Sequence, residues 1–319
     1  MLAFFVTHYN AYMRMNLLVT LMLYFIAAAA SAGDTYVYVL GIAQDAGYPQ
    51  TNCYKPHCMR AWDEPGLRRK ASSIAVVDDA AKAKYLFDAT PDMREQLYAL
   101  HKVAPDGDYS LDGVFLTHAH MGHYTGLMHF GREAAGTAGI PVYAMPRMHQ
   151  YLSENGPWDQ LVRLANIDLI EMADGAAIEP GPRITVTPFL VPHRDEYSET
   201  VGFRIDGPQK SAVFIPDIDK WEMWSIDIRD VVRSVDYALL DATFFKDGEL
   251  GERDMSKIKH PFVAESMDLF ESLSAEEKSR VIFIHMNHTN PLLFDGSPEQ
   301  AEVERRGFKY AREGMRLDL

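Results

Sequence analysis

The sequence predicts an α/β protein in which two β-sheets lie together with helices on their outer sides. Strand-like and helix-like segments are interspersed along the chain, and strand-rich stretches occur in both of its halves. The chain has no low-complexity run, no repeat with a period of about 20–50 residues and no long Gly/Ser linker. A single domain over residues 33–319 is therefore the simplest organisation.

Strands are predicted where short apolar runs are rich in β-branched and aromatic residues. These runs cover residues 36–42, 72–77, 84–89, 113–118, 141–145, 167–172, 183–191, 200–206, 211–217, 236–242 and 280–285. Helical periodicity predicts helices over residues 92–103, directly after His123, over 148–155, near 221–233, over 262–272 and over 297–307. Ser297 is suited to cap the last of these helices and Gly307 to end it.

Residues 1–32 carry the pattern of an export signal and are not expected to belong to the domain. Arg14 precedes an uncharged stretch over residues 17–32, which ends in the small-x-small cleavage pattern Ala-Ser-Ala at Ala32. A membrane-spanning helix needs about 20 apolar residues, so a cleaved signal peptide is favoured over a stable membrane anchor. We predict a mature protein that starts near Gly33 and is periplasmic or secreted.

The overall composition is that of an ordinary globular protein with an ample core. Apolar residues make up 47% of the chain and charged residues 24%, and the net charge is −14. Because binding to a nucleic-acid backbone needs a basic face, this charge disfavours a nucleic-acid partner. A local metal site can still be positive, so we expect a small and anionic substrate. The sequence is also compatible with a homodimer.

Several predicted strands end in a residue type that binds metal ions. These residues are Asp88, His118, His193, Asp217, Asp241 and His285. In sheet-based enzymes, residues at the ends of strands project into one crevice. Six such endings in one chain therefore indicate a shared site.

The stretch "LTHAHMGHYTGL" (residues 116–127) contains the strongest metal-binding pattern. His118 and His120 are two residues apart, so an extended segment turns both imidazoles to the same side. His123 follows at a predicted helix start and would point to a neighbouring position. Neutral imidazole suits Zn²⁺, Fe and related ions. A histidine-rich surface loop is the alternative, but the other strand ends favour a metal site.

We predict two metal positions in this site. His118, His120 and His193 would bind one ion, and His123 and His285 would bind a second. Asp217 would bridge the two ions. Two metal ions about 3.5–4 Å apart can hold a hydroxide nucleophile and polarise a phosphoryl or carbonyl oxygen.

The order of these residues resembles the metallo-β-lactamase superfamily, whose fold is an αββα four-layer sandwich. The stretches "LGIAQDAGYPQTNC", "LLDATFF" and the tail that begins "IHMNHTNPLLFDG" resemble one branch of it. That branch contains the pyrroloquinoline quinone biosynthesis protein B, a cyclic phosphodiesterase and the tRNA 3′-processing endonucleases. The resemblance implies Zn²⁺, one or two per chain, with Fe or Mn as alternatives. The metal ligands that it implies are His118, His120, His123, His193, Asp217 and His285. It also implies that Asp88 orients the histidine loop.

Gly122 departs from the His-x-His-x-Asp-His motif of this family. The aspartate at that position normally helps to bind the second metal. Without it, we expect a lower affinity at the second position, and one metal per chain could be the resting state.

The resemblance further implies an acid pair of Asp241, in "LLDATFF", and His260, in "KHPF". A histidine titrates near neutral pH, and a carboxylate partner keeps it protonated so that it can donate a proton to a leaving oxygen. The alternative is that Asp241 caps a strand and His260 is a surface residue. Together with Asp217, these two residues are the predicted catalytic residues.

Cys53 and Cys58 flank His57 in "NCYKPHC". In an exported protein we favour a disulfide or two free thiols, and the alternative is a zinc site that includes His57. His288 follows His285 by three residues. We interpret it as a loop histidine, with a role as a substitute ligand as the alternative.

Trp221 and Trp224 are spaced as on a helix and are interpreted as core residues, with a substrate pocket as the alternative. The polar loop 195–200 after His193 could form the rim of the site.

These patterns favour a metal-dependent hydrolase that acts on phosphodiester or cyclic phosphodiester bonds. Lactones and other esters are the next most favoured substrates. An iron-dependent oxidative or accessory protein of the quinone-biosynthesis type is the alternative, supported by the tail and opposed by the export signal. A binding protein without catalytic activity is a third hypothesis, and Gly122 supports it.

Overall fold

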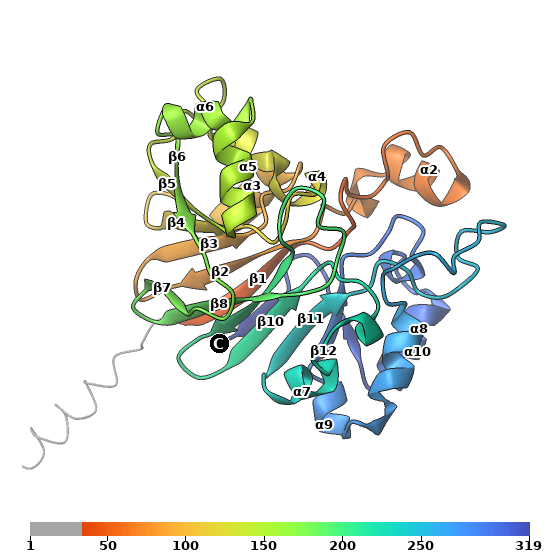
Figure 1. Ribbon diagram of the computed structural model, residues 1–319. Coiled ribbons are helices and arrows are strands. Elements are labelled where there is room, and N and C mark those ends of the chain that lie inside the picture. The colour runs from red at the N-terminus through yellow and green to blue at the C-terminus, as the bar shows by residue number, and fades with distance from the viewer. Residues whose placement is uncertain (1–33) are drawn as a thin grey trace, which may run out of the picture. The chain divides into compact units, whose positions relative to one another are not determined.

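Two seven-stranded mixed sheets form the centre of the protein (Figure 1). The computed structural model describes residues 34–319, so the predicted signal peptide lies outside the described residues. The first sheet has the order β14-β1-β2-β3-β4-β5-β6, and its strands are Arg316–Asp318 (β14), Thr35–Gly41 (β1), Ser73–Asp78 (β2), Ala83–Phe87 (β3), Ser110–Phe115 (β4), Ile140–Ala144 (β5) and Ile167–Glu171 (β6). The second has the order β13-β12-β11-β10-β9-β8-β7, and its strands are Lys309–Tyr310 (β13), Val281–Ile284 (β12), Tyr237–Asp241 (β11), Ser211–Ile215 (β10), Val201–Asp206 (β9), Ile184–Leu190 (β8) and Ile178–Gly181 (β7).

The two sheets pack face to face around a core of aromatic and β-branched side chains. The ring of Phe203 on β9 lies 5.4 Å from that of Phe87 on β3 and 5.8 Å from that of Phe115 on β4. Val37 and Ile74 of the first sheet belong to the same buried cluster as the apolar residues of the second. Burying one face of each sheet is what joins the two halves of the chain.

Helices cover the outer faces of both sheets, as Figure 1 shows. On the first sheet these are α3 (Met93–His101), α5 (Pro146–Glu154) and α6 (Trp158–Arg163), and Leu100 and Leu152 pack against Leu86 and Val114. On the second sheet these are α7 (Ile228–Arg233), α8 (Val263–Leu269), α9 (Ala275–Lys278) and α10 (Pro298–Arg305). The αββα four-layer fold is thus confirmed.

The remaining elements are short. They are α2 (Pro56–Asp63), α4 (Met121–Tyr124) and the 3₁₀ helices η1 (Pro65–Leu67), η2 (Thr125–Phe130), η3 (Trp221–Met223), η4 (Phe270–Ser272) and η5 (Pro291–Leu293). None of the helices in the described part of the chain has the length and apolarity needed to span a membrane.

The direction of the strands brings the predicted site residues together. β3 and β4 are parallel, and so are β10, β11 and β12. The carboxyl ends of parallel neighbours meet at one edge of a sheet. Asp88 directly follows β3, Asp241 ends β11 and His285 directly follows β12. The site therefore lies at this edge of both sheets.

Candidate metal centre

The first group of ligand-type side chains consists of His118, His120, His193 and Asp217. His118 Nε2 and His193 Nε2 lie 3.3 Å and 3.2 Å from Oδ2 of Asp217. His120 faces the same point with its Nδ1, which lies 2.8 Å from His118 Nε2 and 3.3 Å from His193 Nε2. Three imidazole nitrogens and one carboxylate oxygen converge, which is a donor set that Zn²⁺ accepts.

The other ring nitrogen of each of these histidines contacts a neighbouring oxygen. The pairs are His118 Nδ1 with Thr117 Oγ1 (3.0 Å), His120 Nε2 with Glu196 Oε2 (3.0 Å) and His193 Nδ1 with Asp219 Oδ1 (3.1 Å). Such outer contacts fix the tautomer and the orientation of a ligand imidazole. The nitrogens that face the centre are therefore the ones left free to bind.

The second group consists of His123, His285, Asp217 and Asp45. His123 Nε2 lies 3.5 Å from Oδ1 of Asp45 and 3.8 Å from Oδ2 of Asp217. His285 Nε2 lies 3.9 Å from the same oxygen of Asp45. Asp217 belongs to both groups, which is the position that a bridging carboxylate requires.

The outer nitrogens of the second group are also held. His123 Nδ1 lies 2.7 Å from Oδ2 of Asp88, and Oδ1 of Asp88 accepts the backbone N–H of Thr117 at 2.8 Å. His285 Nδ1 lies 3.1 Å from Oγ1 of Thr243. Asp88 thus connects the first histidine loop to β3, as an orienting residue would.

Unpartnered polar atoms mark the place where an ion fits. Eight buried side-chain polar atoms in the described part of the chain have no hydrogen-bond partner. Four of the eight lie in the second group: Asp45 Oδ1, His123 Nε2, Asp217 Oδ1 and His285 Nε2. A buried polar atom without a partner is unfavourable, so four such atoms at one point form a site that a cation fits.

The charges in the centre also suit a cation. Burial lowers the pKa of His285, and burial together with His123 lowers the pKa of His118, so both imidazoles are neutral. Burial alone would raise the pKa of Asp217, but His193 holds it well below its usual range. Neutral imidazoles and ionised carboxylates are the forms that bind metal ions.

His123 and His193 differ from these two imidazoles, because carboxylates raise their pKa values against the effect of burial, Asp217 in the case of His193. Burial would lower the pKa of His123, but the carboxylates of Asp88 and Asp45 raise the pKa of His123 to about 10. The excess of negative charge around Nε2 attracts a positive charge there. A metal ion that binds Nε2 would have to displace a proton.

The predicted acid pair lies beside the bridging carboxylate. His260 Nδ1 lies 2.8 Å from Oδ2 of Asp241 and 3.2 Å from Oδ1 of Asp217. Burial would lower the pKa of His260, but Asp241 and Asp217 raise it to about 9. Asp241 is fully buried and accepts the N–H groups of Ile218 and Thr243. His260 is therefore a positioned imidazolium and is not a surface residue.

The sequence patterns did not identify Asp45 as a site residue. It lies four residues past the end of β1, in the stretch "LGIAQDAGYPQTNC". The signal that could have revealed it is the same one that revealed His193 and Asp217, a ligand-type residue just beyond a predicted strand.

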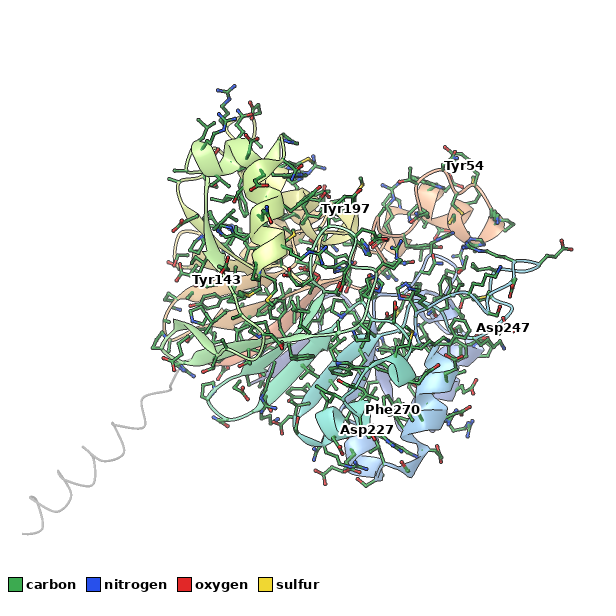
Figure 2. All side chains as sticks on the ribbon, viewed as in Figure 1. Tyr54, Tyr143, Tyr197, Asp227, Asp247 and Phe270 are labelled. Carbon is green, nitrogen blue, oxygen red and sulfur yellow. The ribbon has the colours of Figure 1, made fainter. Side chains whose placement is uncertain are left out.

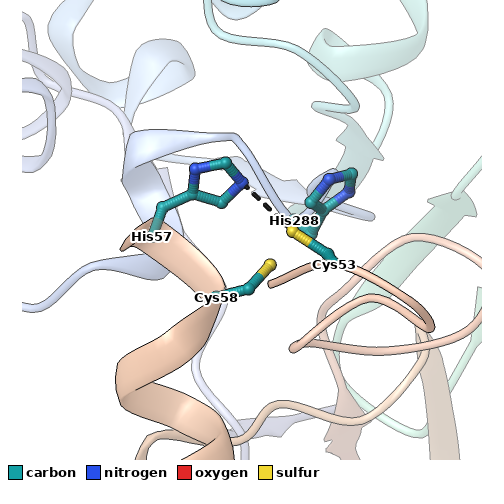
Figure 3. A group of neighbouring side chains, drawn as sticks. All are labelled: Cys53, His57, Cys58 and His288. Atoms are coloured by element: carbon teal, nitrogen blue, oxygen red, sulfur yellow. Dashed lines mark hydrogen bonds between the residues drawn. The ribbon is translucent and has the colours of Figure 1, made fainter. Parts of the chain in front are cut away.

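Cys53, His57, Cys58 and His288 form a separate group, drawn in Figure 3. Their potential ligand atoms all lie within 4.8 Å of one another, and both cysteines are free thiols. Two thiols and two imidazoles are a donor set that Zn²⁺ takes, so this group could hold a metal ion. The structure thus places His288 beside the cysteines and not beside the metal groups.

Two further predicted features border the site. Trp221 is buried and donates to Oγ of Ser266 at 2.8 Å, as expected for a core residue. Trp221 and Trp224 also line a cavity of about 490 Å³ that reaches Pro261, next to His260. Each tryptophan therefore has a packing role and a place on a cavity wall.

The loop 195–200 lies against the first histidine loop. Oγ of Ser198 accepts the backbone N–H of Ala119 at 2.8 Å, and Glu196 reaches His120. Tyr197, labelled in Figure 2, is exposed on this loop. The loop is thus placed where the sequence suggested a rim.

Comparisons with known proteins place the chain in a known family. A family model described as the beta-lactamase superfamily domain matches residues 83–286. The coenzyme PQQ synthesis protein B of Methylorubrum extorquens (strain PA1) is 30% identical over 311 residues, which cover 89% of this chain and 100% of that protein. Its namesake in Pseudomonas putida (strain W619) is 29% identical over 313 residues, with the same coverage.

Solved structures of related proteins share the fold of this chain. The crystal structure of Zn²⁺-bound PqqB from Methylobacterium extorquens is similar with a TM-score of 0.74 and 27% identity, and covers 89% of this chain and 100% of that one. A diphosphatase from the PhnP family shares the fold, with a TM-score of 0.61, 24% identity and coverage of 89% and 97%.

Proposed function

The chain belongs to the β-lactamase superfamily, and from this premise we propose that it is a metal-dependent hydrolase of phosphodiester or cyclic phosphodiester bonds. The observation that carries the proposal is the pair of His260 and Asp241 next to Asp217. A bond that breaks with an alkoxide leaving group needs a proton donor, and a phosphodiester is such a bond.

The side chains divide into a metal-holding set and a proton-donating set. The metal-holding set comprises His118, His120, His193, His123, His285, Asp217 and Asp45. Zn²⁺ bound there would lower the pKa of a bound water to about 7 and polarise a phosphoryl oxygen.

His260 is the proton donor in this proposal. Asp241 accepts from its Nδ1 side, so the ring is held in one orientation and its other nitrogen is left for the substrate. Asp217 lies on the same side of the ring as Asp241 and adds negative charge that keeps the imidazole protonated. The leaving oxygen would receive its proton from Nε2 of His260.

A cavity of about 630 Å³ supports an anionic substrate. It borders Ala46 and Gly47, directly after Asp45, and its walls include basic side chains. These are Arg68, Arg69, Lys70 and Arg94, and the acidic Asp92 and Glu95 lie on the same wall. In a protein with a net charge of −14, four basic side chains on one cavity wall favour binding of a phosphate group, although Arg94 is paired with Glu95 and Lys70 with Glu313.

The test is hydrolysis of bis(p-nitrophenyl) phosphate by the purified protein loaded with Zn²⁺, Mn²⁺ or Fe²⁺. We expect turnover, and we expect H260Q to lose roughly 100-fold or more with a poor leaving group such as an alkyl alcohol. The loss should be much smaller for p-nitrophenol, which leaves without a proton. D241N should show the same leaving-group dependence, because Asp241 acts through His260.

Two results would overturn this proposal. One is a fully metallated protein that leaves all phosphodiesters untouched. The other is an equal loss for good and poor leaving groups in H260Q, since a proton donor acts mainly on poor ones. Turnover of lactones alone would move the substrate class to esters.

A second candidate is an iron-dependent oxidative or accessory role in cofactor synthesis. It is favoured by the relatives named coenzyme PQQ synthesis protein B, whose full length this chain covers. Elemental analysis that finds iron, together with oxygen consumption by the purified protein, would support this candidate over the hydrolase.

A further inference from the structure

We propose that Asp45 is the carboxylate ligand of the second metal position and replaces the aspartate that is absent at position 122. The inference rests on the proposed function only because it requires a metal-binding centre. A carboxylate that the family places inside the histidine motif would here come from the turn after β1. The carboxylate that is absent at Gly122 would then be supplied by Asp45.

The orientation of the ligands supports this role for Asp45. Asp88 and Thr243 hold the outer nitrogens of His123 and His285, so both Nε2 atoms face inward. Oδ1 of Asp45 lies 3.5 Å and 3.9 Å from these two nitrogens. An ion placed between three atoms at such spacings can contact all of them.

Oδ1 of Asp45 is buried without a hydrogen-bond partner, although 45% of the side chain is exposed. A carboxylate with partial access to solvent could rotate its oxygen into water. Its inward orientation is explained if a cation is the partner of that oxygen.

Space makes a side chain at position 122 incompatible with Asp45. A Cβ atom at Gly122 would lie 2.4 Å from Cα, 2.7 Å from Oδ1 and 2.9 Å from the carbonyl oxygen of Asp45. Two of these three atoms belong to the backbone, so a rotamer change cannot relieve the contact. The glycine is therefore required by the close approach of the turn that carries Asp45, and it does not by itself indicate a decayed motif.

The turn that carries Asp45 is firmly attached to the centre. Gln44 donates its N–H to the carbonyl of Met286 at 2.8 Å, and Met286 donates to Ile42 at 2.8 Å. Met286 follows the ligand His285 directly. Asp45 itself has a φ of +40°, a left-handed conformation that aspartate tolerates better than most residues. The position of the carboxylate is thus fixed relative to His285.

The first test is metal binding by D45N and does not depend on turnover. Metal per chain is counted by elemental analysis, and the affinities are measured by competition with a chelator. The C53S/C58S background is used so that the cysteine group does not enter the count. We expect D45N to lose one ion per chain, or to bind it roughly 100-fold or more weakly, with the first ion unchanged. D247N removes an exposed carboxylate outside the site and should leave both ions bound.

The second test asks whether a carboxylate at position 122 can replace that of Asp45. G122D alone should not gain metal and should lower the unfolding temperature, because its side chain meets the backbone of Asp45. D45G should lose the second ion while keeping the left-handed turn without strain. In the double variant D45G/G122D, we expect no second ion, because Cα and the carbonyl oxygen of residue 45 still meet the Cβ at position 122. Titration with Co²⁺ gives an independent readout, since two absorbing sites should become one in D45N.

Two outcomes would overturn the proposal: unchanged metal content in D45N, or tighter binding of the second ion in G122D with Asp45 present. These results are separate from the failure of the hydrolase proposal. A protein that binds two ions and loses one in D45N would support Asp45 as a ligand even if it hydrolysed no phosphodiester.

Discussion

At the scale of single residues, the contacts behind the ligands are as informative as the ligands. Asp88 receives the N–H and hydroxyl of Thr117 on Oδ1 and faces His123 Nδ1 with Oδ2. With Asp88 as the acceptor, one proton of His123 is held on Nδ1, so a metal ion at Nε2 displaces only the proton on that nitrogen. The identity of this side chain therefore decides which nitrogen of His123 can act as a ligand.

The variant D88N tests this dependence. The oxygen of the new amide should remain with the N–H of Thr117, so the amide nitrogen would face His123 and move the imidazole proton to Nε2. We expect a second-site affinity roughly 10–100-fold lower, measured by chelator competition, with little change in the first site. D78N is the matched control, because Asp78 is an equally buried aspartate at the other end of these strands. Unchanged affinity in D88N would contradict the prediction.

Glu249 gives a second prediction at this scale. Burial raises the pKa of Glu249 from 4.5 to about 7, against the hydrogen bonds from Thr289 and the backbone of Phe245. The folded state thus holds the proton more tightly than the unfolded chain. This contribution to stability is full below pH 4.5 and is lost as the pH rises to about 7. It corresponds to at most about 3 kcal/mol.

Urea unfolding of the wild type and E249Q over this pH range tests the sign. The free energy of unfolding of the wild type minus that of E249Q should fall between pH 4.5 and about 7 and then level off. A constant offset from altered hydrogen bonds does not affect this slope. A difference that stays flat or rises with pH would show that Glu249 is ionised in the fold throughout.

Single residues also show where sequence reasoning stops. Ligand types at strand ends were visible in the chain, and the structure brings His118, His193, Asp217 and His285 together. Asp45 also lies just beyond a predicted strand, but it was not recognised, because the histidine motif gives no information about a turn more than 70 residues away. The replacement of a carboxylate at position 122 by Asp45 depends on the close approach of Gly122 to Asp45, which the sequence spacing does not encode.

At the scale of elements, the helices and strands that could be predicted were the longer ones, in which apolar residues recur with a clear period. All the predicted strands occur, but β7, β13 and β14 were missed. β13 and β14 have two and three residues, too few to show alternation, and β7 contains Pro180 and Gly181, which are typical of turns and strand edges. The helices α2, α6 and α9 were also missed, because they have only eight, six and four residues, which is too short to show a clear helical period.

One contact between elements holds the histidine loop in place. The N–H of Gly126, in η2, donates to the carbonyl of Ala89 at 2.9 Å, and the N–H of Ala89 donates to the carbonyl of His123 at 2.8 Å. A Cβ at Gly126 would lie 2.2 Å from the carbonyl oxygen of Thr90. The histidine loop and the segment after β3 are thus in direct backbone contact.

We therefore predict that G126A separates these two segments. It should lower the free energy of unfolding by about 1–3 kcal/mol, as overpacking does, and should weaken the second metal position by displacing Asp88 from His123. Chemical unfolding and chelator competition measure the two effects. G66A is the control, because nothing lies within 4 Å of a Cβ at Gly66. If G126A and G66A had the same free energy of unfolding and the same metal affinity, the close approach of Gly126 to Thr90 would not be needed.

At the scale of the whole molecule, export stays a prediction. β1 begins at Thr35, two residues after the predicted mature start at Gly33, so cleavage there would remove no strand or helix of the described domain. The predicted signal peptide and its cleavage site can be tested by N-terminal sequencing of the protein from periplasmic and cytosolic fractions.

The metal centre also connects the two sheets of the molecule. Asp45 and the three histidines of the first loop follow strands of the first sheet, whereas His193, Asp217 and His285 follow strands of the second. An ion bound by both sets stabilises the contact between the sheets and binds only the folded state. Binding at a free-ion concentration 100 times the dissociation constant adds about 2.7 kcal/mol to the free energy of unfolding.

We predict that removing metal from the C53S/C58S protein with a chelator lowers its unfolding temperature by about 5–10 °C in one cooperative step. Adding Zn²⁺ back should restore the original value, and D45N should show a smaller shift because it retains one ion. Differential scanning calorimetry with parallel elemental analysis measures both. A protein that loses all its metal without any change in unfolding temperature would show that the sheets hold together independently of the centre. Two separate transitions after chelation would show that the two halves unfold apart and that the centre alone couples them.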